Sequence, residues 1–529
     1  MRTFLLAALA APLCLAWQPP EFDVIIAGGR VVDGSGAPWR YADVGITGDR
    51  IAAIGRLAGR KAALTVDARG RVVAPGFIDI HTHARRGIFL DPTAQNYIRQ
   101  GVTTLLEGND GSSPIPIAPF LAKLAAAPMS VNFGTFAGQG SIRQEVMGLV
   151  NRPDTPEEMA RMRSIMEQAM RDGAFGLSSG LFYVPGNFTP TPEVVEIARI
   201  AGSFGGIYIS HMRDEAASVE DAVRETIRIG EEGGLPTQVT HHKIIGKANW
   251  GKSRETIALV EAARARGVDA TIDAYPYTAS STGTAALFPQ WALEGGQKAL
   301  LERLTAPDTR ARIKSVIIDK ILNDRGGGSA ENVVMAGCSW DPTLDGQSLS
   351  AINRARKRAE NVENDAETAI EIQQKGGCSA VYHAISEDDV ERILRYPYTM
   401  IGSDGEIPTF GKGAPHPRSY GTFARVLGRY VRERRTLTIE DAVRRMSAYP
   451  AARLGLGDRG LIRPGMKADL AVFDPATVAD RSDFAKPHQY AVGFDWVFVN
   501  GKAVIEGGAV SKNRPGVVLY GPGRPPKGL

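Results

Sequence analysis

Short apolar runs alternate with longer amphipathic stretches through the middle of this 529-residue chain. Eight of the runs are typical of buried strands, and the stretches between them have apolar residues at the spacing of helices. The predicted strands are 77–83, 102–107, 130–136, 174–180, 207–211, 236–241, 268–274 and 398–404. The predicted intervening helices include 157–172, 192–203, 217–232 and 253–266. Eight strand–helix units predict an α/β fold, a closed (β/α)8 TIM-like barrel.

Both ends of the chain have a different pattern. Residues 22–76 and 461–510 contain short alternating apolar stretches broken by glycines, such as DVIIAGGRVVDG and WVFVNGKAVIEGG. Such stretches are typical of antiparallel strands. We therefore predict one small β-sandwich formed by both termini, flanking a barrel that occupies residues 77–460. Residues 511–529 are rich in glycine and proline and are predicted to form a C-terminal surface extension.

The seventh and eighth predicted strands are more than a hundred residues apart, which is too far for one loop. We predict an inserted subdomain over about 280–345, followed by helices near 348–375 and 386–395. Only Cys338 and Cys378 lie outside the N-terminal segment. Two cysteines without a Cys-x-x-Cys pair are not expected to form a disulfide framework or to carry the chemistry.

The N-terminal segment has the pattern of a secretion signal. Arg2 precedes an apolar stretch from Phe4 to Ala16, and Gln18 and two prolines follow. The stretch is short for a membrane span, so we predict a signal peptide over 1–17 and an exported protein, periplasmic or secreted. The alternative is an uncleaved anchor. After cleavage no membrane span is expected.

The composition changes this picture little. The chain is 43% hydrophobic and 23% charged, as in globular proteins with a large core. The net charge of +4 comes from interspersed residues of both signs, and no basic run alternates with aromatic residues. A nucleic-acid partner is therefore not expected. The sequence does not indicate an oligomeric state.

Four of the eight histidines end predicted barrel strands. His81 and His83 end PGFIDIHTH, and alternate residues of a strand share a face. His211 ends GGIYISH and His241 ends LPTQVTH, whereas the neighbouring His242 points the other way. One such histidine is more simply a core residue. Four of them around one barrel mouth predict a metal site, because imidazole is a common zinc ligand.

Two carboxylates extend this site. Asp404 follows the eighth strand in TMIGSDG, where it can bind a metal and accept a proton from water. We predict that Asp404 is both a metal ligand and the catalytic base. Asp110 follows the second strand in GVTTLLEGNDG and is the predicted bridging ligand, with Glu107 as a competitor. The other interpretation of Asp110 is a turn residue before Gly111.

Five of these residues resemble, in type and in order along the chain, the metal ligands of the amidohydrolase superfamily. They are His81, His83, His211, His241 and Asp404. From about residue 24 to 510 the chain is similar to the N-acyl-D-amino-acid deacylases (D-aminoacylases). The similar segments are GLFYVPGNF, SHMRDE, THHKIIGKANWG, DAYPYTASST and SDGEIPTFGKGAPHPRSYGTFARVLGRY. The resemblance implies one or two Zn2+ ions, and another divalent metal is left open.

The bridge between two metals departs from the family pattern. Many superfamily members use a carboxylated lysine on the fourth strand, but this strand reads GAFGLSSG and contains no lysine. Some D-aminoacylases carry a cysteine where Asp110 stands. A carboxylate suits harder cations than a thiolate does, so the identity and number of the metals stay open.

The resemblance also implies the reaction, which is hydrolysis of the amide bond of N-acyl-D-amino acids to a carboxylate and a free D-amino acid. The family's carboxylate-binding residues correspond to Tyr183, Lys243, Tyr275 and Arg418, with Tyr277 as an alternative to Tyr275. Arginine, lysine and tyrosine hydroxyls suit the free carboxylate of such a small molecule. Taken alone, Lys243 or Arg418 is more simply explained as a surface charge.

Several alternatives remain at this point. One is another amidohydrolase, such as a D-residue dipeptidase or a dihydropyrimidinase-like cyclic-amide hydrolase. A non-catalytic scaffold or a carboxylate-binding receptor is a different class, and the ordered metal ligands argue against it. The first part of the insertion contains Phe288 and Trp291, and no cationic residue lies between Tyr277 and Lys298. If it lines the pocket, hydrophobic D-amino acids are preferred; otherwise both aromatic residues belong to the subdomain core.

Overall fold

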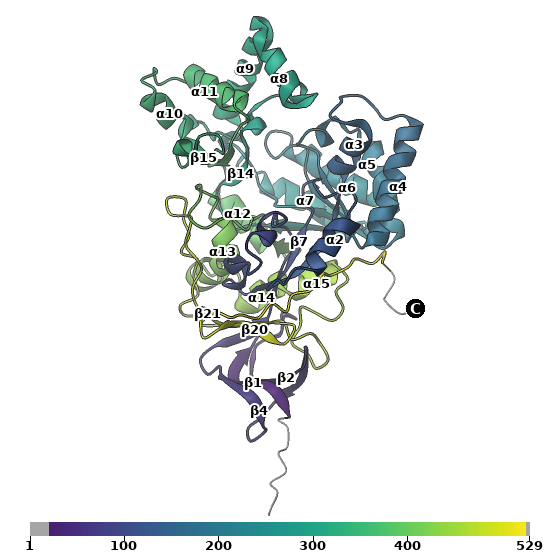
Figure 1. Cartoon of the computed structure of the whole chain (residues 1–529), viewed down its shortest axis with the longest axis vertical. Helices are drawn as coiled ribbons and strands as arrows, with labels where there is room; N and C mark the ends of the chain where they lie inside the picture. Colours follow the sequence, from purple (N-terminus) through teal and green to yellow (C-terminus); the bar gives the residue numbers. More distant parts are fainter. Residues whose placement is uncertain (1–20, 525–529) are drawn as a thin grey trace, which may run out of the picture.

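The computed structural model describes residues 21–524, so the predicted signal peptide at 1–17 lies outside the described residues. A sheet built from both termini lies at one end of the molecule, a barrel in the middle and a mainly helical insertion at the other end (Figure 1). Within residues 21–524, no helix has both the length and the apolar character needed to cross a lipid bilayer.

The barrel contains the eight predicted strands. They are β6 (Phe77–Asp79), β7 (Val102–Glu107), β8 (Asn132–Thr135), β10 (Gly176–Gly180), β11 (Ile207–His211), β12 (Thr237–Val239), β13 (Ala270–Ala274) and β17 (Thr399–Ile401). All are fully buried, as expected for parallel strands covered by helices.

Two backbone hydrogen bonds close these strands into a ring. The strands form two parallel sheets, β6-β7-β8 and β17-β13-β12-β11-β10-β9, where β9 is Ala137–Gly138. The Phe175 N–H donates to the Thr135 carbonyl at 2.9 Å, next to β10 and β8. The Asp404 N–H donates to the His81 carbonyl at 2.8 Å, beyond the ends of β17 and β6. The predicted barrel is therefore confirmed, and the ends of β6 and β17 lie side by side.

The helices of the barrel match the predicted ranges closely. They are α4 (Pro156–Asp172), α5 (Thr191–Ser203), α6 (Val219–Gly233), α7 (Ser253–Ala265) and α12 (Glu387–Arg395). The first of them begins with a capping box between Thr155 and Glu158 and ends at Gly173 in the left-handed conformation. Further helices are α1 (Gln95–Ile98), α2 (Ala118–Ala125), α3 (Gln139–Met147), α13 (Arg418–Arg425), α14 (Ile439–Met446) and α15 (Ala448–Arg453).

The insertion is longer than predicted. Its elements are β14 (Ser280–Gly283), α8 (Gly296–Thr305), α9 (Pro307–Asn323), β15 (Val333–Gly337), α10 (Leu349–Ala355), α11 (Val362–Gln374) and β16 (Ser379–Tyr382). The strands form an antiparallel sheet in the order β14-β16-β15. One apolar core runs from Leu287 to Tyr382. The predicted end near residue 345 is therefore wrong, and the helices predicted near 348–375 are α10 and α11 of the same insertion.

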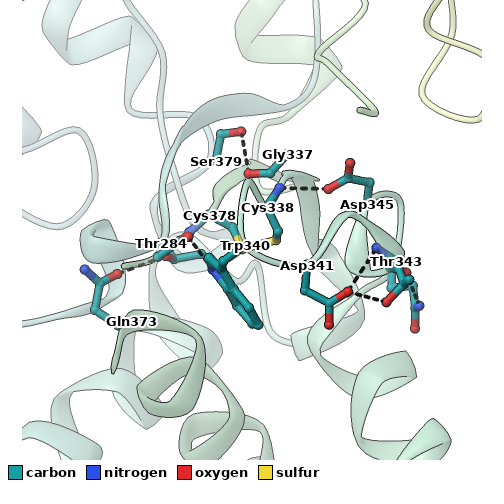
Figure 2. Close-up of a disulfide and its surroundings, with 12 residues drawn as sticks. Thr284, Gly337, Cys338, Trp340, Asp341, Thr343, Asp345, Gln373, Cys378 and Ser379 are labelled. Atoms are coloured by element: carbon teal, nitrogen blue, oxygen red, sulfur yellow. Dashed lines mark hydrogen bonds between the residues drawn. A yellow bond between two sulfur atoms is a disulfide. The ribbon is translucent and has the colours of Figure 1, made fainter. Parts of the chain in front are cut away.

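A disulfide bond joins Cys338 and Cys378 within the insertion (Figure 2). Their Cα atoms lie 4.5 Å apart although 40 residues separate them in the sequence. The Trp340 indole N–H donates to the Gly377 carbonyl at 3.0 Å beside the bond. The sequence reasoning expected no disulfide framework and did not predict this single bond. The pairing of β15 with β16 brings them together, and no local sequence pattern indicates it.

The two termini share one sheet of nine strands. These are β1 (Phe22–Val31), β2 (Arg40–Thr47), β3 (Arg50–Gly55), β4 (Ala62–Asp67), β5 (Val72–Pro75), β18 (Leu470–Phe473), β19 (Phe494–Val499), β20 (Lys502–Glu506) and β21 (Ala509–Val510). The two ends meet because β5 pairs with both β1 and β18. Apolar residues from both ends, including Val44, Val472 and Phe498, share one core. The two ends of the chain therefore form one unit, as predicted, and this unit is one continuous hydrogen-bonded sheet.

The residues after this sheet are not a free surface extension, up to residue 524 where the description ends. They run along the barrel strand β8, where the Phe133 N–H donates to the Val517 carbonyl at 3.0 Å. The Leu519 N–H donates in turn to the Phe133 carbonyl at 2.8 Å. This part of the tail lies at the surface, where all its residues except Gly521 are half-buried or exposed, and its backbone pairs with a strand that the linear sequence does not place beside it.

Candidate metal centre

The six predicted metal ligands meet at the carboxyl ends of the barrel strands. His83 Nε2 lies 2.9 Å from Asp404 Oδ1, and His81 Nε2 lies 3.3 Å from Asp110 Oδ1. His241 Nε2 lies 3.4 Å from Asp110 Oδ1, and the rings of His211 and His241 are 4.4 Å apart. Residues that span more than three hundred positions of the sequence thus form one cluster.

This cluster consists of two overlapping groups that share Asp110. The ligand atoms of one group lie within 4.8 Å of one another, and so do those of the other. The groups are His81, His83, Asp110 and Asp404, and Asp110, His211 and His241. The position of Asp110 between them suits a bridging carboxylate. The competing Glu107 belongs to neither group and instead accepts a hydrogen bond from the Arg85 N–H at 2.9 Å.

The donor atoms fit a divalent cation. Both ring nitrogens of His81 and His211 are buried without a hydrogen-bond partner among the described residues. The same holds for Nε2 of His241 and Oδ1 of Asp110. Buried polar atoms in folded proteins normally have partners. Imidazole nitrogens and carboxylate oxygens in this number are ligands that zinc and similar cations accept.

The backbone at this cluster is held in unusual conformations. Asp110, His241 and Asp404 have φ angles of +53°, +34° and +52°, which residues other than glycine seldom adopt. Such strain persists only where the surrounding structure enforces it, and it concentrates at functional sites. The backbone of Asp110 also needs Gly180 at the end of β10, because a Cβ there would lie 2.2 Å from the Asp110 carbonyl oxygen.

Further carboxylates lie behind the histidines. Glu215 Oε1 is 3.2 Å from His241 Nδ1, and Asp273 Oδ1 is 3.6 Å from His81 Nδ1. The Asp273 carboxylate also accepts the His241 backbone N–H at 2.7 Å. Carboxylates in this position orient metal-binding imidazoles. The sequence reasoning missed both residues, although Glu215 follows His211 by four positions and Asp273 is a carboxylate within a buried strand.

The environment shifts the pKa values of the cluster in opposite directions. Burial alone would lower the pKa of His81, but the nearby Asp110, Asp273 and Asp404 raise it to about 10. Burial lowers the pKa of His211 to about 4. For Asp404, burial would raise the pKa, but the charges of Arg418 and His83 hold it well below its usual range. Asp404 is therefore ionised at neutral pH.

The four predicted carboxylate-binding residues line one cavity of 390 Å³ together with five of the six metal ligands, all except His81. The Tyr275 ring lies between two cations, 5.5 Å from Lys243 Nζ and 5.0 Å from Arg418 Cζ. Arg418 Nη1 lies 2.7 Å from Asp404 Oδ2. Tyr183 contributes a hydroxyl that is 3.1 Å from Thr282 Oγ1. The alternative residue Tyr277 does not line the cavity, and its hydroxyl donates to a backbone carbonyl.

The lining of the cavity also tests the predictions for the insertion and for His242. Phe288 and Trp291 belong to the core of the insertion and do not line the cavity, so they give no basis for a hydrophobic substrate preference. The cation that the insertion does bring to the cavity is Arg325, which the sequence reasoning missed. His242 points away from the cluster, as predicted, and its Nε2 is 2.8 Å from Thr256 Oγ1.

A (β/α)8 barrel with histidines and aspartates clustered at its mouth defines a metal-binding barrel of the amidohydrolase class. Comparison of the sequence agrees with this class, since residues 64–323 and 353–505 match the model of the amidohydrolase family. The chain belongs to this family.

Within the family, the chain is similar to deacylases of D-amino acids. D-aminoacylase from Alcaligenes xylosoxydans xylosoxydans is 39% identical, covering 94% of this chain and 97% of that protein. A crystal structure of D-aminoacylase is 37% identical, with a TM-score of 0.81 over 94% of this chain and 100% of the other.

A second solved structure contains a metal. N-acyl-D-glutamate deacylase from Bordetella bronchiseptica, in complex with zinc and a phosphonate mimic of the tetrahedral intermediate, is 34% identical, with a TM-score of 0.82 over 94% of this chain and 99% of the other. D-aminoacylase itself has been described with a binuclear metal centre. A D-hydantoinase, at 16% identity and a TM-score of 0.56, shares the fold alone.

Proposed function

We propose that this protein hydrolyses the amide bond of N-acyl-D-amino acids and releases a carboxylate and a free D-amino acid. The observation that carries this proposal is one cavity that holds both the metal-ligand cluster and the cations Lys243 and Arg418. An N-acyl amino acid presents a free carboxylate beside its scissile amide, which suits this arrangement. A cyclic amide has no such carboxylate, and the relatives with high identity act on N-acyl-D-amino acids.

The proposed cofactor is zinc, as one or two ions, and another divalent metal is the alternative. His81, His83, Asp110 and Asp404 would hold one ion, and Asp110, His211 and His241 would hold the other. When bound, a divalent cation lowers the pKa of water from about 15.7 toward about 7 and polarises a carbonyl group. The D configuration of the substrate rests on the similarity to the deacylases.

The residues of the chain then have distinct roles. Lys243, Tyr275 and Arg418 bind the substrate carboxylate and so hold the scissile amide beside Asp404. The Asp404 carboxylate takes a proton from the attacking water as the water oxygen bonds to the acyl carbon. Asp404 passes this proton to the amide nitrogen as the carbon–nitrogen bond breaks, and the amine leaves. Glu215 and Asp273 keep the imidazoles in place.

The test is an assay of the zinc-loaded protein on paired N-acetyl-D- and N-acetyl-L-amino acids and on dihydrouracil as a cyclic amide. We expect release of free D-amino acids and little turnover of the other two classes. Equal turnover of both enantiomers would remove the D assignment. Hydrolysis of dihydrouracil alone would overturn the proposed function.

We also propose that the protein is exported to the periplasm or secreted. The apolar segment after Arg2 supports this, and so does the disulfide between Cys338 and Cys378, because disulfides persist in oxidising compartments. The experiment is fractionation of cells that express the full chain, with N-terminal sequencing of the product. A mature N-terminus close to residue 17 in the exported fraction is the expected result. Retention of Met1 in the cytosol would contradict it.

A further inference from the structure

Arg325 belongs to the insertion but reaches the barrel mouth. It lies two residues beyond the end of α9, is 2% exposed, and lines the same cavity as Lys243 and Tyr183. Its guanidinium carbon lies 4.2 Å from the centre of the Phe182 ring, which fixes the side chain from one side. Among the described residues, Arg325 is the only charged side chain that the insertion contributes to this cavity.

The hydrogen bonds of Arg325 are incomplete. Nη2 donates to Glu215 Oε2 at 3.2 Å, and within the described residues this is its single hydrogen bond. Its Nε is buried without a partner. Glu215 also accepts from Lys243 and contacts His241 Nδ1, so one carboxylate is shared between two cations. A buried guanidinium with unused donors is costly unless a ligand completes it.

The charges around the cavity indicate what this ligand is. The buried cations that line it are Lys243, Arg325 and Arg418. Asp110 and Asp404 together balance one divalent metal ion, and the remaining carboxylates of the lining are Glu215, which is buried, and Glu406, which is exposed. Among the buried groups of the described residues, with neutral histidines, three cations stand against the single remaining carboxylate Glu215, which leaves two positive charges. The exposed Glu406 is solvated and is not counted. One substrate carboxylate balances only one of these two buried charges.

We propose that Arg325 binds a second carboxylate of the substrate and so selects N-acyl-D-amino acids with an acidic side chain. This inference rests on the proposed function. The first carboxylate lies with Lys243 and Arg418 around Tyr275, and the side chain extends toward the insertion. There the hydroxyls of Tyr183 and Thr282, 3.1 Å apart, line the cavity near Arg325 and offer further hydrogen bonds to a carboxylate. The preference is opposite to the hydrophobic one that the sequence suggested.

The test compares acidic substrates with their neutral isosteres. Zinc-loaded wild type is assayed on N-acetyl-D-glutamate and N-acetyl-D-aspartate against N-acetyl-D-glutamine and N-acetyl-D-asparagine. We expect a higher kcat/KM for the acids by about 10- to 100-fold, the factor that a hydrogen-bonded charge pair contributes. Arg325→Gln is expected to remove most of this difference, chiefly by raising KM for the acids, and Arg325→Lys to retain part of it.

Arg312→Gln is the matched control. Arg312 is exposed on the same helix, α9, and does not line the cavity, so this variant is expected to keep the wild-type ratio. Equal kcat/KM of wild type for acids and amides would overturn the proposal even if the Arg325 variants did not fold. A loss that is equal for acids and amides, at unchanged zinc content and melting temperature, would also overturn it.

Two further arms separate this proposal from the proposed function. A preference for N-succinyl-D-alanine over all acidic side chains would place the second carboxylate on the acyl group and reject the assignment. If no N-acyl-D-amino acid is hydrolysed, the proposed function fails. In that case calorimetry still tests the role of Arg325 by comparing the binding of D-glutamate with that of D-glutamine. Tighter binding of D-glutamate that is lost in Arg325→Gln would support the proposed role. Equal binding of the two ligands would reject it.

Discussion

Asp110 is the residue on which the two halves of the metal centre depend. Its carboxylate belongs to both ligand groups, and its backbone adopts a left-handed conformation directly after β7. The fourth strand, β10, ends in glycine and carries no lysine, so a carboxylated lysine is not available from it. The Asp110 carboxylate, which belongs to both ligand groups, offers oxygen ligands and one negative charge, and it is a harder ligand than a cysteine thiolate at this position would be.

Replacement of Asp404 by asparagine is expected to abolish turnover while the protein stays folded. The amide cannot take up the proton from water, and proton transfer by a positioned side chain contributes about 10²- to 10⁴-fold to the rate. The measurement is kcat of the zinc-loaded variant, together with its circular dichroism spectrum. Glu406→Gln is the control, since Glu406 is an exposed carboxylate of the same cavity. Turnover close to wild type in Asp404→Asn would remove Asp404 from the mechanism.

Zinc affinity is expected to rise with pH. In the metal-free protein the surrounding carboxylates raise the pKa of His81 to about 10, so its imidazole carries a proton at neutral pH. A metal ligand must be unprotonated, so zinc binding releases this proton, and the affinity increases about tenfold per pH unit for each proton released. Calorimetric titrations in buffers of different ionisation enthalpy measure the release. An affinity that is constant between about pH 6 and pH 8 would contradict this prediction.

At the scale of elements, the insertion both completes the cavity and depends on its own crosslink. The strand β14 lines the cavity with residues 280–283, and Arg325 reaches it from the end of α9. The disulfide fixes the segments next to β15 and β16 in the same unit, as Figure 2 shows. The position of Arg325 at the barrel mouth therefore relies on the folding of a subdomain that lies outside the barrel.

Loss of the disulfide is expected to destabilise the insertion. Closing a loop of 40 residues restricts the unfolded chain, and such a crosslink contributes about 2–4 kcal/mol to the free energy of unfolding. The double variant Cys338→Ser, Cys378→Ser should melt at a lower temperature than wild type, and a reducing agent should lower the melting temperature of wild type alone. A reducing agent that affects both proteins equally would argue against a structural role of this bond.

At the scale of the whole molecule, metal binding and folding are coupled. The ligands come from five barrel strands or the turns after them, so the site exists only when the barrel is closed. Zinc should therefore stabilise the folded state, by about 4 kcal/mol at a free concentration a thousand times its dissociation constant. Scanning calorimetry with and without zinc measures this effect. The variant His211→Ala should show a smaller shift, and a melting temperature of wild type that does not respond to zinc would contradict the assignment of a metal site.

The linear sequence determined the barrel and most of the metal centre. A buried parallel strand is a local apolar run, and its last residue faces the barrel mouth, so the positions of His81, His211, His241 and Asp404 followed from the strands themselves. Asp110 was predicted from its place just beyond the second strand and from the resemblance, with Glu107 left open, and the structure brings only Asp110 into the ligand groups. The residues for the substrate carboxylate came from the resemblance to the deacylases, and the structure places all four of them in the cavity.

The tertiary structure alone decided the features that depend on contacts between distant residues. The disulfide forms because β15 and β16 pair, and Phe288 is buried, with the half-buried Trp291 packed beside it, because the insertion has its own core. Glu215 and Arg325 are 110 residues apart, and they meet only when the insertion packs over the barrel mouth. Hydrophobic periodicity reports which face of an element is buried, but it does not report which other element covers that face. The charge of the substrate pocket is therefore a property of the assembled molecule.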